Sequence, residues 1–121
     1  MKAVFDTNIL IDYLNGIDNA KSEIDLYTER YISVITVIET LVGASTEEEE
    51  TAIRRFLSTF QIKELSKSIA EISIQLRKEN RLKVPDAIVY GTAKDEGCIL
   101  VTRNTKEMKR DWPDIRVPYT L

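Results

Sequence analysis

The segment Lys2-Ala3-Val4-Phe5-Asp6-Thr7-Asn8-Ile9-Leu10-Ile11-Asp12-Tyr13-Leu14 decides the fold of this chain of 121 residues. Its apolar start, Lys2–Phe5, predicts a short strand, and Thr7–Leu14 predicts a helix that closes near Asn15-Gly16. Asp6 stands between the two elements. In an open parallel α/β sheet, strand ends of this kind lie along one edge, and ligands bind there.

The rest of the chain continues this alternation of strand and helix. Further strands are predicted at Tyr31–Ile35, Gln61–Leu65, Cys98–Thr102 and Ile115–Pro118. Further helices are predicted at Asp18 to about Glu29, Thr36–Val42, Thr46–Phe60, from a cap at Ser66 through Leu76, and Pro85–Glu96 with Gly97 at its end. We therefore predict a single α/β/α domain of three layers over residues 1–121, with a central, mostly parallel sheet of about five strands.

Four acidic side chains fall at or just past apolar runs: Asp6, Glu39, Asp86 and Glu107. We expect three of them to stand where a strand gives way to a helix, and all four to face one point. Asn104 lies nearer the end of the preceding strand and offers a neutral oxygen ligand. Carboxylates grouped without a cation repel one another and raise one another's pKa values, and a divalent metal removes that repulsion. The pattern predicts a Mg²⁺ or Mn²⁺ site that acts on a phosphate-containing substrate.

Each acid also has a local explanation. Asp6 is a good N-cap for the helix that follows it, and Glu39 fits a capping box with Thr36. Asp86 lies in a first helical turn, where the helix dipole favours any acid. Glu107 fits a solvated acid in a charged loop. Capping, however, does not explain why acids from distant segments fall at the ends of neighbouring strands.

The composition narrows the chemistry further. The chain has no histidine and one cysteine, Cys98, which excludes Ser-His-Asp and Cys-His sites and zinc sites built on histidine or thiolate. It has no GxxxxGK[ST] or GxGxxG loop, so we expect no ordinary ATP or dinucleotide site. The single cysteine indicates a reducing cytoplasm. No apolar run reaches the roughly 18 residues of a membrane span, and Asp6 interrupts the first run too early for a signal peptide.

The charge is uneven along the chain. The net charge is −3, but residues 1–60 hold five basic and eleven acidic side chains, whereas residues 61–121 hold twelve and nine. An acidic chain argues against indiscriminate nucleic-acid binding. It leaves room for a local basic lip near the acids, built from Arg81, Lys83, Arg103, Lys106, Lys109 and Arg110.

The segments that hold the acids also carry a resemblance to a known family. They are Val4-Phe5-Asp6-Thr7-Asn8, Ser33-Val34-Ile35-Thr36-Val37-Ile38-Glu39 with Gly43 behind it, Asp86-Ala87-Ile88-Val89-Tyr90 with Ala93, and Leu100-Val101-Thr102-Arg103-Asn104-Thr105-Lys106-Glu107-Met108. In order and spacing, over nearly the full length, they resemble the PIN-domain ribonucleases, especially VapC-like toxins of type II toxin–antitoxin systems. The resemblance implies a compact α/β/α domain and Mg²⁺- or Mn²⁺-dependent cleavage of single-stranded or structured RNA.

The same resemblance carries over Asp6, Glu39 and Asp86 as metal ligands. It leaves the fourth ligand open between two residues. Many relatives place Asp directly after Thr-Arg, where this chain has Asn104, and others place an acid three residues later, where it has Glu107. One metal site or two is left equally open.

The expected chemistry is metal-assisted hydrolysis of a phosphodiester, in which the metal lowers the pKa of a bound water. We expect Thr7, Asn8 and Thr102 to orient the ligands or the water. Arg103 or Lys106 is expected to bind an RNA phosphate.

The resemblance also implies partners. A small antitoxin should cover the site and reach the carboxylates with an Arg or Lys, and relatives are often homodimers. Ile11, Leu14 and Ile17 on the early helices are candidates for antitoxin contact, and core packing is the other reading of each. The alternative function is a PIN-like module that binds RNA or protein without cutting it, which Asn104 keeps open. Receiver domains and HAD-type phosphatases are disfavoured, because Asp6-Thr7-Asn8 lacks their paired acids.

Overall fold

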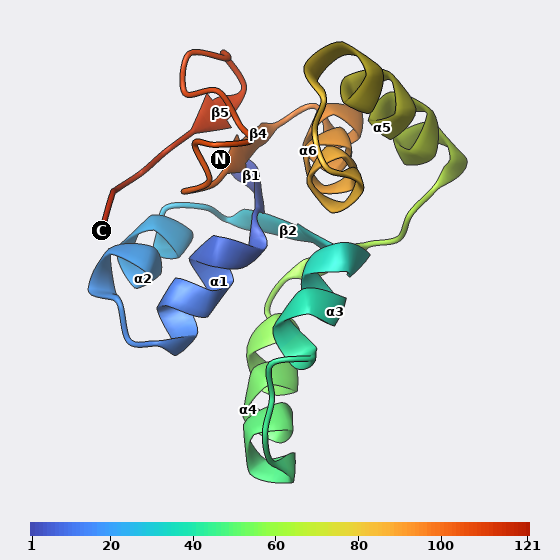
Figure 1. The fold of residues 1–121 in the computed structure, drawn as a ribbon. Helices are drawn as coiled ribbons and strands as arrows, with labels where there is room; N and C mark the ends of the chain where they lie inside the picture. The colour runs from blue at the N-terminus through green and yellow to red at the C-terminus, as the bar shows by residue number, and fades with distance from the viewer.

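The computed structural model describes all of residues 1–121 and contains five strands and six helices. In chain order they are β1 (Lys2–Phe5), α1 (Thr7–Leu14), α2 (Asp18–Asp25), β2 (Glu29–Ser33), α3 (Val34–Leu41), α4 (Glu47–Leu57), β3 (Gln61–Lys63), α5 (Lys67–Asn80), α6 (Val84–Glu96), β4 (Ile99–Val101) and β5 (Ile115–Arg116). Figure 1 shows the sheet in the middle, α1 and α2 to one side of it, α5 and α6 to the other, and the α3–α4 hairpin pointing away. None of the six helices combines the length and the apolar character that crossing a membrane requires.

The five strands form one sheet in the order β3-β2-β1-β4-β5, and every neighbouring pair is parallel. This confirms the predicted parallel sheet. The chain builds outward from β1 in one direction through β2 and β3, then returns to the other side of β1 for β4 and β5. The order of the strands therefore reverses at β1, and a crevice for ligands forms at such a switch point in α/β sheets.

Apolar side chains of the strands alternate between two cores, one on each face of the sheet. Ala3 and Phe5 of β1 pack into a cluster with residues of α1, α2 and α4. Val4, between them, packs into a second cluster with residues of α5 and α6. Gly91 of α6 lets the last two helices approach closely, since a Cβ there would lie 2.7 Å from Ser73 Oγ on α5. Two cores around one sheet confirm the predicted three layers.

The segment from α2 to α3 differs from the predicted boundaries. The helix predicted to about Glu29 ends at Asp25, because Glu29 already pairs with Lys2 in the sheet. The following strand is Glu29–Ser33 and not Tyr31–Ile35. Ser33 accepts a hydrogen bond from the Ile35 amide at 3.0 Å and so caps α3, which draws the last two predicted strand residues into the helix.

Elsewhere the helix signals hold better than the strand ends. Ser66 caps α5, and Gly97 ends α6 with a φ of +68°, a conformation that favours glycine. Thr46 caps α4, which then stops at Leu57, three residues before the predicted end. Strands β3, β4 and β5 are each shorter than predicted.

The first prediction concerns the core beneath β1. Phe5 is completely buried and makes edge-to-face contacts with Tyr27 and Phe60. We expect Phe5→Ala to lower the free energy of unfolding by about 3–5 kcal/mol, through lost burial and the cavity left behind. Urea unfolding followed by circular dichroism measures this. Leu26→Ala is the control, because Leu26 is 55% exposed and should change stability by less than about 0.5 kcal/mol. Similar losses in both variants would contradict the packing described.

Candidate functional site

Asp6 lies directly after β1, at the point where the strand order reverses. Its backbone N–H donates to the Val101 carbonyl at 2.9 Å, so the residue is held beside the end of β4. Its carboxylate is 4% exposed. One oxygen accepts from the Thr7 amide at 2.8 Å, and the other accepts from the Thr102 hydroxyl at 2.8 Å and from the Asn8 amide group at 3.3 Å. Asp6 is thus both the predicted N-cap of α1 and a carboxylate fixed at the sheet edge.

The electrostatics of Asp6 are dominated by burial. Burial raises the pKa of Asp6 above its ordinary value, and the nearby charge of Glu39 raises it further. Hydrogen bonds from Thr102, Thr7 and Asn8 favour the charged form but do not bring the pKa back to its ordinary value. The charged form of Asp6 is therefore costly in the folded protein, and a bound cation would stabilise it.

Glu39 lies on α3, and it is tied to Asp6 through Thr7. The Thr7 hydroxyl donates to Glu39 Oε1 at 2.7 Å, while the Thr7 amide holds Asp6. The expected capping box with Thr36 is not formed, because α3 begins earlier and Ser33 caps it. Thr36 is instead buried inside the helix, 3.0 Å from the Thr7 hydroxyl. Glu39 is exposed and projects beside α1, in the second turn of α3 and not at a strand end.

Asp86 comes from the other side of the sheet, in the first turn of α6. Asp86 follows α5 and a short loop, so it does not stand where a strand gives way to a helix. Partial burial raises its pKa to about 6, and the charges of Asp6, Glu107 and Glu39 add to the shift, while Lys83 opposes it weakly. The other three predicted acids therefore lie close enough to Asp86 for their charges to raise its pKa.

The fourth acid belongs to a tight turn after β4. The Thr102 hydroxyl, which donates to Asp6, also accepts from the Asn104 amide at 3.0 Å. The Asn104 side-chain oxygen in turn accepts from the Glu107 amide at 3.3 Å. The Asn104 oxygen, the neutral ligand that the sequence offered, therefore already accepts one hydrogen bond. Glu107 is half-buried, and its charge raises the pKa of Asp86.

None of the four acids has a cationic partner. Elsewhere the chain neutralises its buried acids, since Asp12 pairs with Arg103, and Glu23 pairs with Arg116. No Lys or Arg lies within ion-pair distance of the four: Asp6, Glu39, Asp86 and Glu107. Unpaired carboxylates this close to one another repel, and a bound cation would relieve the repulsion.

The donor chemistry fits a hard divalent cation, because carboxylate oxygens supply it and no nitrogen or sulfur ligand is near. No three acidic side chains are arranged to hold a metal ion as the structure stands. Glu39 and Glu107 have long side chains, and rotation of these side chains toward Asp6 would be required. Asp6 itself is fixed, so it would form the centre of such a site.

The two predicted phosphate-binding residues differ in their surroundings. Both line a polar cleft of about 380 Å³ beside Asn8, formed by Arg103, Asn104, Thr105 and Lys106. The Arg103 guanidinium already donates to both oxygens of Asp12, at 2.7 and 2.8 Å. This pairing disfavours its use as a phosphate ligand. Lys106 is exposed and makes no ion pair.

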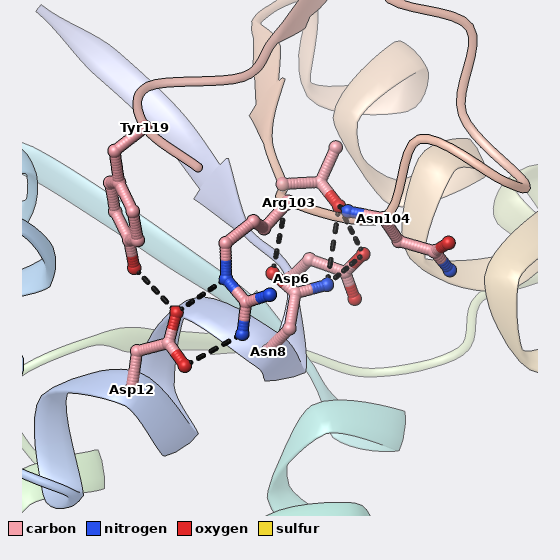
Figure 2. Close-up of polar contacts among 7 residues, drawn as sticks. Asp6, Asn8, Asp12, Arg103, Asn104 and Tyr119 are labelled. Carbon is pink, nitrogen blue, oxygen red and sulfur yellow. Dashed lines mark hydrogen bonds and ion pairs between the residues drawn. The ribbon is translucent and has the colours of Figure 1, made fainter. Parts of the chain in front are cut away.

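Sequence reasoning missed the cluster that supports this cleft. Figure 2 shows the Arg103 guanidinium facing Asp12 of α1, with Tyr119 reaching the same carboxylate from the C-terminal segment. One signal was available. Asp12 interrupts the apolar run Ile9-Leu10-Ile11 on the helix that follows Asp6, and a buried acid needs a partner. The identity of that partner, 91 residues away, was not readable from sequence.

Comparison with known proteins agrees with the motifs. The sequence pattern of the PIN domain family matches residues 3–111. Ribonuclease VapC1 from Methanocaldococcus jannaschii is 30% identical over 115 residues, which cover 90% of this chain and 80% of that protein.

Solved structures share the fold over its full length. A chain of a toxin–antitoxin complex from Klebsiella pneumoniae is 43% identical, with a TM-score of 0.93 and coverage of 99% of this chain and 100% of that chain. A chain of VapBC2 from Rickettsia felis, solved with a DNA fragment from its promoter, is 25% identical with a TM-score of 0.80, covering 100% of this chain and 99% of that chain. A chain of DNA-bound VapBC from Salmonella typhimurium is 25% identical with a TM-score of 0.81, covering 99% and 98%.

The electrostatics of Asp86 generate the second prediction. The folded-state pKa of Asp86, about 6, lies above its ordinary value of 3.8. Its contribution to stability is therefore fully present below pH 3.8 and is lost as the pH rises through 6. At pH 7.5 in EDTA, we expect Asp86→Asn to raise the free energy of unfolding by about 1–2 kcal/mol, allowing for partial solvent screening. The gain should shrink at pH 4. Urea unfolding at both pH values measures it.

Asp114→Asn is the matched control. Burial alone would raise the pKa of Asp114, but hydrogen bonds from Tyr90 and Lys94 hold it below its ordinary value. Its contribution is therefore present above the ordinary pKa and is lost as the pH falls. We expect Asp114→Asn to destabilise the protein at pH 7.5. If Asp86→Asn were destabilising there as well, the acids would not be repelling one another as described.

Proposed function

The chain belongs to the PIN domain family, which confirms the resemblance of its four motifs, and from this premise we propose that it is a metal-dependent endoribonuclease. It hydrolyses RNA phosphodiester bonds with Mg²⁺ or Mn²⁺ and acts in the cytoplasm as the toxin of a toxin–antitoxin pair. The observation that carries the proposal is the group of four acids around the end of β1, which has no cationic partner although other buried acids of the chain are paired.

We assign each residue of such a site a separate role. When bound, the metal supplies an activated water at neutral pH and neutralises charge on the phosphate. Asp6 holds the centre, because three hydrogen bonds fix its carboxylate. Thr7 orients Glu39, and Asp86 completes the set from α6. We assign the fourth position to Glu107, because it supplies a negative charge that already acts on Asp86, whereas Asn104 supplies none.

RNA would approach over the turn after β4. The cleft beside Asn8 has no apolar lining residue, as suits a sugar–phosphate backbone. Lys106 is an exposed cation that lines this cleft, and we assign it the phosphate contact in preference to Arg103, which is paired with Asp12. Selection among RNAs would rest on shape and charge, with no aromatic base-stacking residue in this cleft.

A protein partner has a suitable groove next to Glu39. A cavity of about 470 Å³ runs between α1, α3 and α4, and its apolar walls include Ile11, Leu14 and Ile53. Ile11 and Leu14 are exposed, as the antitoxin expectation requires, whereas Ile17 packs against the core. We propose that an antitoxin segment lies in this groove and directs a basic side chain at the carboxylates. The toxin–antitoxin complexes similar to this chain support that partner.

A second copy of the chain is the other proposed partner. Ile38 on α3 and Val42 just after it are exposed, and so are Ile74 on α5 and Val84 at the start of α6. Helices α3 and α6 contact each other, and so do α5 and α6, so these side chains belong to neighbouring elements. Apolar surface of this kind is typical of a homodimer interface.

A catalytically inactive binding module is the second candidate. Asn104 favours it, because this position carries an amide where a carboxylate would add a ligand and a charge. The two candidates differ in a single observable, the cleavage of RNA by a protein that is folded and binds metal.

The third prediction tests cleavage. Purified protein with labelled single-stranded or structured RNA should cut in Mg²⁺ or Mn²⁺ and not in EDTA. We expect Asp6→Asn to lose more than about 100-fold in cleavage rate, since removing even an outer partner of a metal ligand commonly costs about 10–100-fold. Asp18→Asn, an equally conservative change at an exposed acid of α2, should cleave like the wild type. Equal cleavage by Asp6→Asn and wild type would show a contaminating nuclease. A folded wild type that binds Mn²⁺ but cuts neither RNA would favour the binding module.

The fourth prediction separates the two possible fourth ligands. Glu107→Gln should lower both Mn²⁺ affinity, measured by calorimetry, and the rate of cleavage by about 10-fold or more. Asn104→Ser keeps a side-chain oxygen for the Glu107 amide and should weaken metal binding much less. The reverse ranking of the two variants would assign the fourth position to Asn104.

A further inference from the structure

Asp12 is an acid outside the candidate metal site, yet it is hydrogen-bonded to the turn after β4, which carries Glu107. Asp12 is 4% exposed and lies on α1, six residues after Asp6. Arg103 donates to both of its oxygens, from Nε at 2.7 Å and from a terminal nitrogen at 2.8 Å. The Tyr119 hydroxyl donates to the same carboxylate at 2.7 Å. Figure 2 shows the guanidinium and the phenol meeting Asp12 from different sides.

Arg103 is held by α1 at two separate points. Its guanidinium binds Asp12, and its backbone N–H donates to Asn8 Oδ1 at 3.0 Å. Asn8 and Asp12 are four residues apart and therefore lie on the same face of the helix. A residue gripped through both its backbone and its side chain has little freedom to slide or rotate along that face.

The neighbours of Arg103 in the chain are the residues that act on the site. Thr102, just before it, donates to Asp6 at 2.8 Å. Asn104, just after it, donates its backbone N–H to Thr102 and accepts from the Glu107 amide. Movement of Arg103 would shift the Thr102 hydroxyl and the Glu107 carboxylate together.

We propose that Asp12 is a positioning residue, which acts through Arg103 to fix the turn Thr102–Glu107 against α1, with Tyr119 completing the clamp. Asp12 itself touches neither metal nor RNA. Its effect on cleavage rests on the function proposed above, whereas its effect on the turn does not. The proposal assigns Arg103 to this clamp and leaves phosphate binding to Lys106.

The charged states that the clamp needs are favoured. Burial alone would raise the pKa of Asp12, but the hydrogen bonds from Arg103 and Tyr119 and the charge of Arg103 together hold it below its ordinary value. The hydrogen bond to Asp12 and its charge raise the pKa of Arg103. A two-point contact between Arg and a carboxylate also fixes orientation, which a Lys in the same place would not do.

The chain contains a second cluster of the same chemistry that serves as a control. Glu23 on α2 is 5% exposed, accepts from Arg116 at 2.6 and 2.9 Å and accepts from the Tyr27 hydroxyl at 2.8 Å. This cluster joins α2 to β5, and the Glu23 side chain has no bond to the turn after β4. Arg116 meets the turn only through its backbone carbonyl, which accepts from the Thr102 N–H at 3.0 Å. Glu23→Gln therefore removes an equivalent charge from an equivalent ion pair and leaves every side-chain bond of the clamp in place.

The fifth prediction is measured on metal-free protein by amide hydrogen exchange. In Asp12→Asn, we expect amides of residues 103, 104 and 107 to exchange at least about ten-fold faster, with β1 and β4 unchanged. Tyr119→Phe, which removes one hydrogen bond, should show a smaller change at the same amides. Arg103→Lys should resemble Asp12→Asn. Glu23→Gln should leave these amides as they are in the wild type.

Cleavage supplies a second reading of the same variants. Asp12→Asn and Tyr119→Phe should lower kcat and leave the KM for RNA within about two-fold, because the clamp does not contact substrate. Glu23→Gln should keep the wild-type kcat. The proposal would be overturned if the turn exchanged at the wild-type rate in both Tyr119→Phe and Arg103→Lys. It would also be overturned if Glu23→Gln accelerated exchange of the turn as much as these variants do. Both tests remain even if Asp12→Asn fails to fold. If the clamp variants exchanged faster but the wild-type protein cut no RNA, the result would support the clamp and reject the nuclease.

Discussion

The pairing of β1 with β4 is the constraint on which the candidate site depends. Phe5 lies opposite Val101 in the parallel ladder, so the next residue of each strand, Asp6 and Thr102, emerge side by side at the sheet edge. The Thr102 hydroxyl then reaches the Asp6 carboxylate directly. Because the strand order reverses at this point, no further strand crosses over the two residues, and α3, α6 and the turn after β4 are left to bring the remaining acids toward them.

The same geometry makes the site costly for the folded chain. Asp6 is buried next to Glu39, and partial burial with three acidic neighbours raises the pKa of Asp86 to about 6. The chain has the means to neutralise acids, as Arg103 does for Asp12 and Arg116 does for Glu23. It does not use them at the sheet edge. Local violations of good packing and charge balance are expected where function requires them, and the rest of the fold offsets the loss.

Much of this arrangement followed from local sequence, and the remainder depended on contacts that no local pattern contains. The strand–helix alternation, the cap at Ser66 and the stop at Gly97 were predicted correctly because each is a short-range signal. The capping box at Glu39 was not formed, since β2 ends at Ser33, which pairs with Lys63 of β3 and caps α3. Asp86 approaches the site from the start of a helix on the far layer, which only the packing of α6 on the sheet decides.

Ion pairs within the fold account for part of the charge imbalance along the chain. The basic excess of residues 61–121 suggested a lip for nucleic acid. Two of these basic residues, Arg103 and Arg116, pair instead with the buried acids Asp12 and Glu23 from the acidic half. The first pair joins α1 to the turn after β4, and the second joins α2 to β5. Part of the excess therefore holds the two ends of the sequence together. The exposed remainder includes Lys106, which is available for the phosphate contact that we propose.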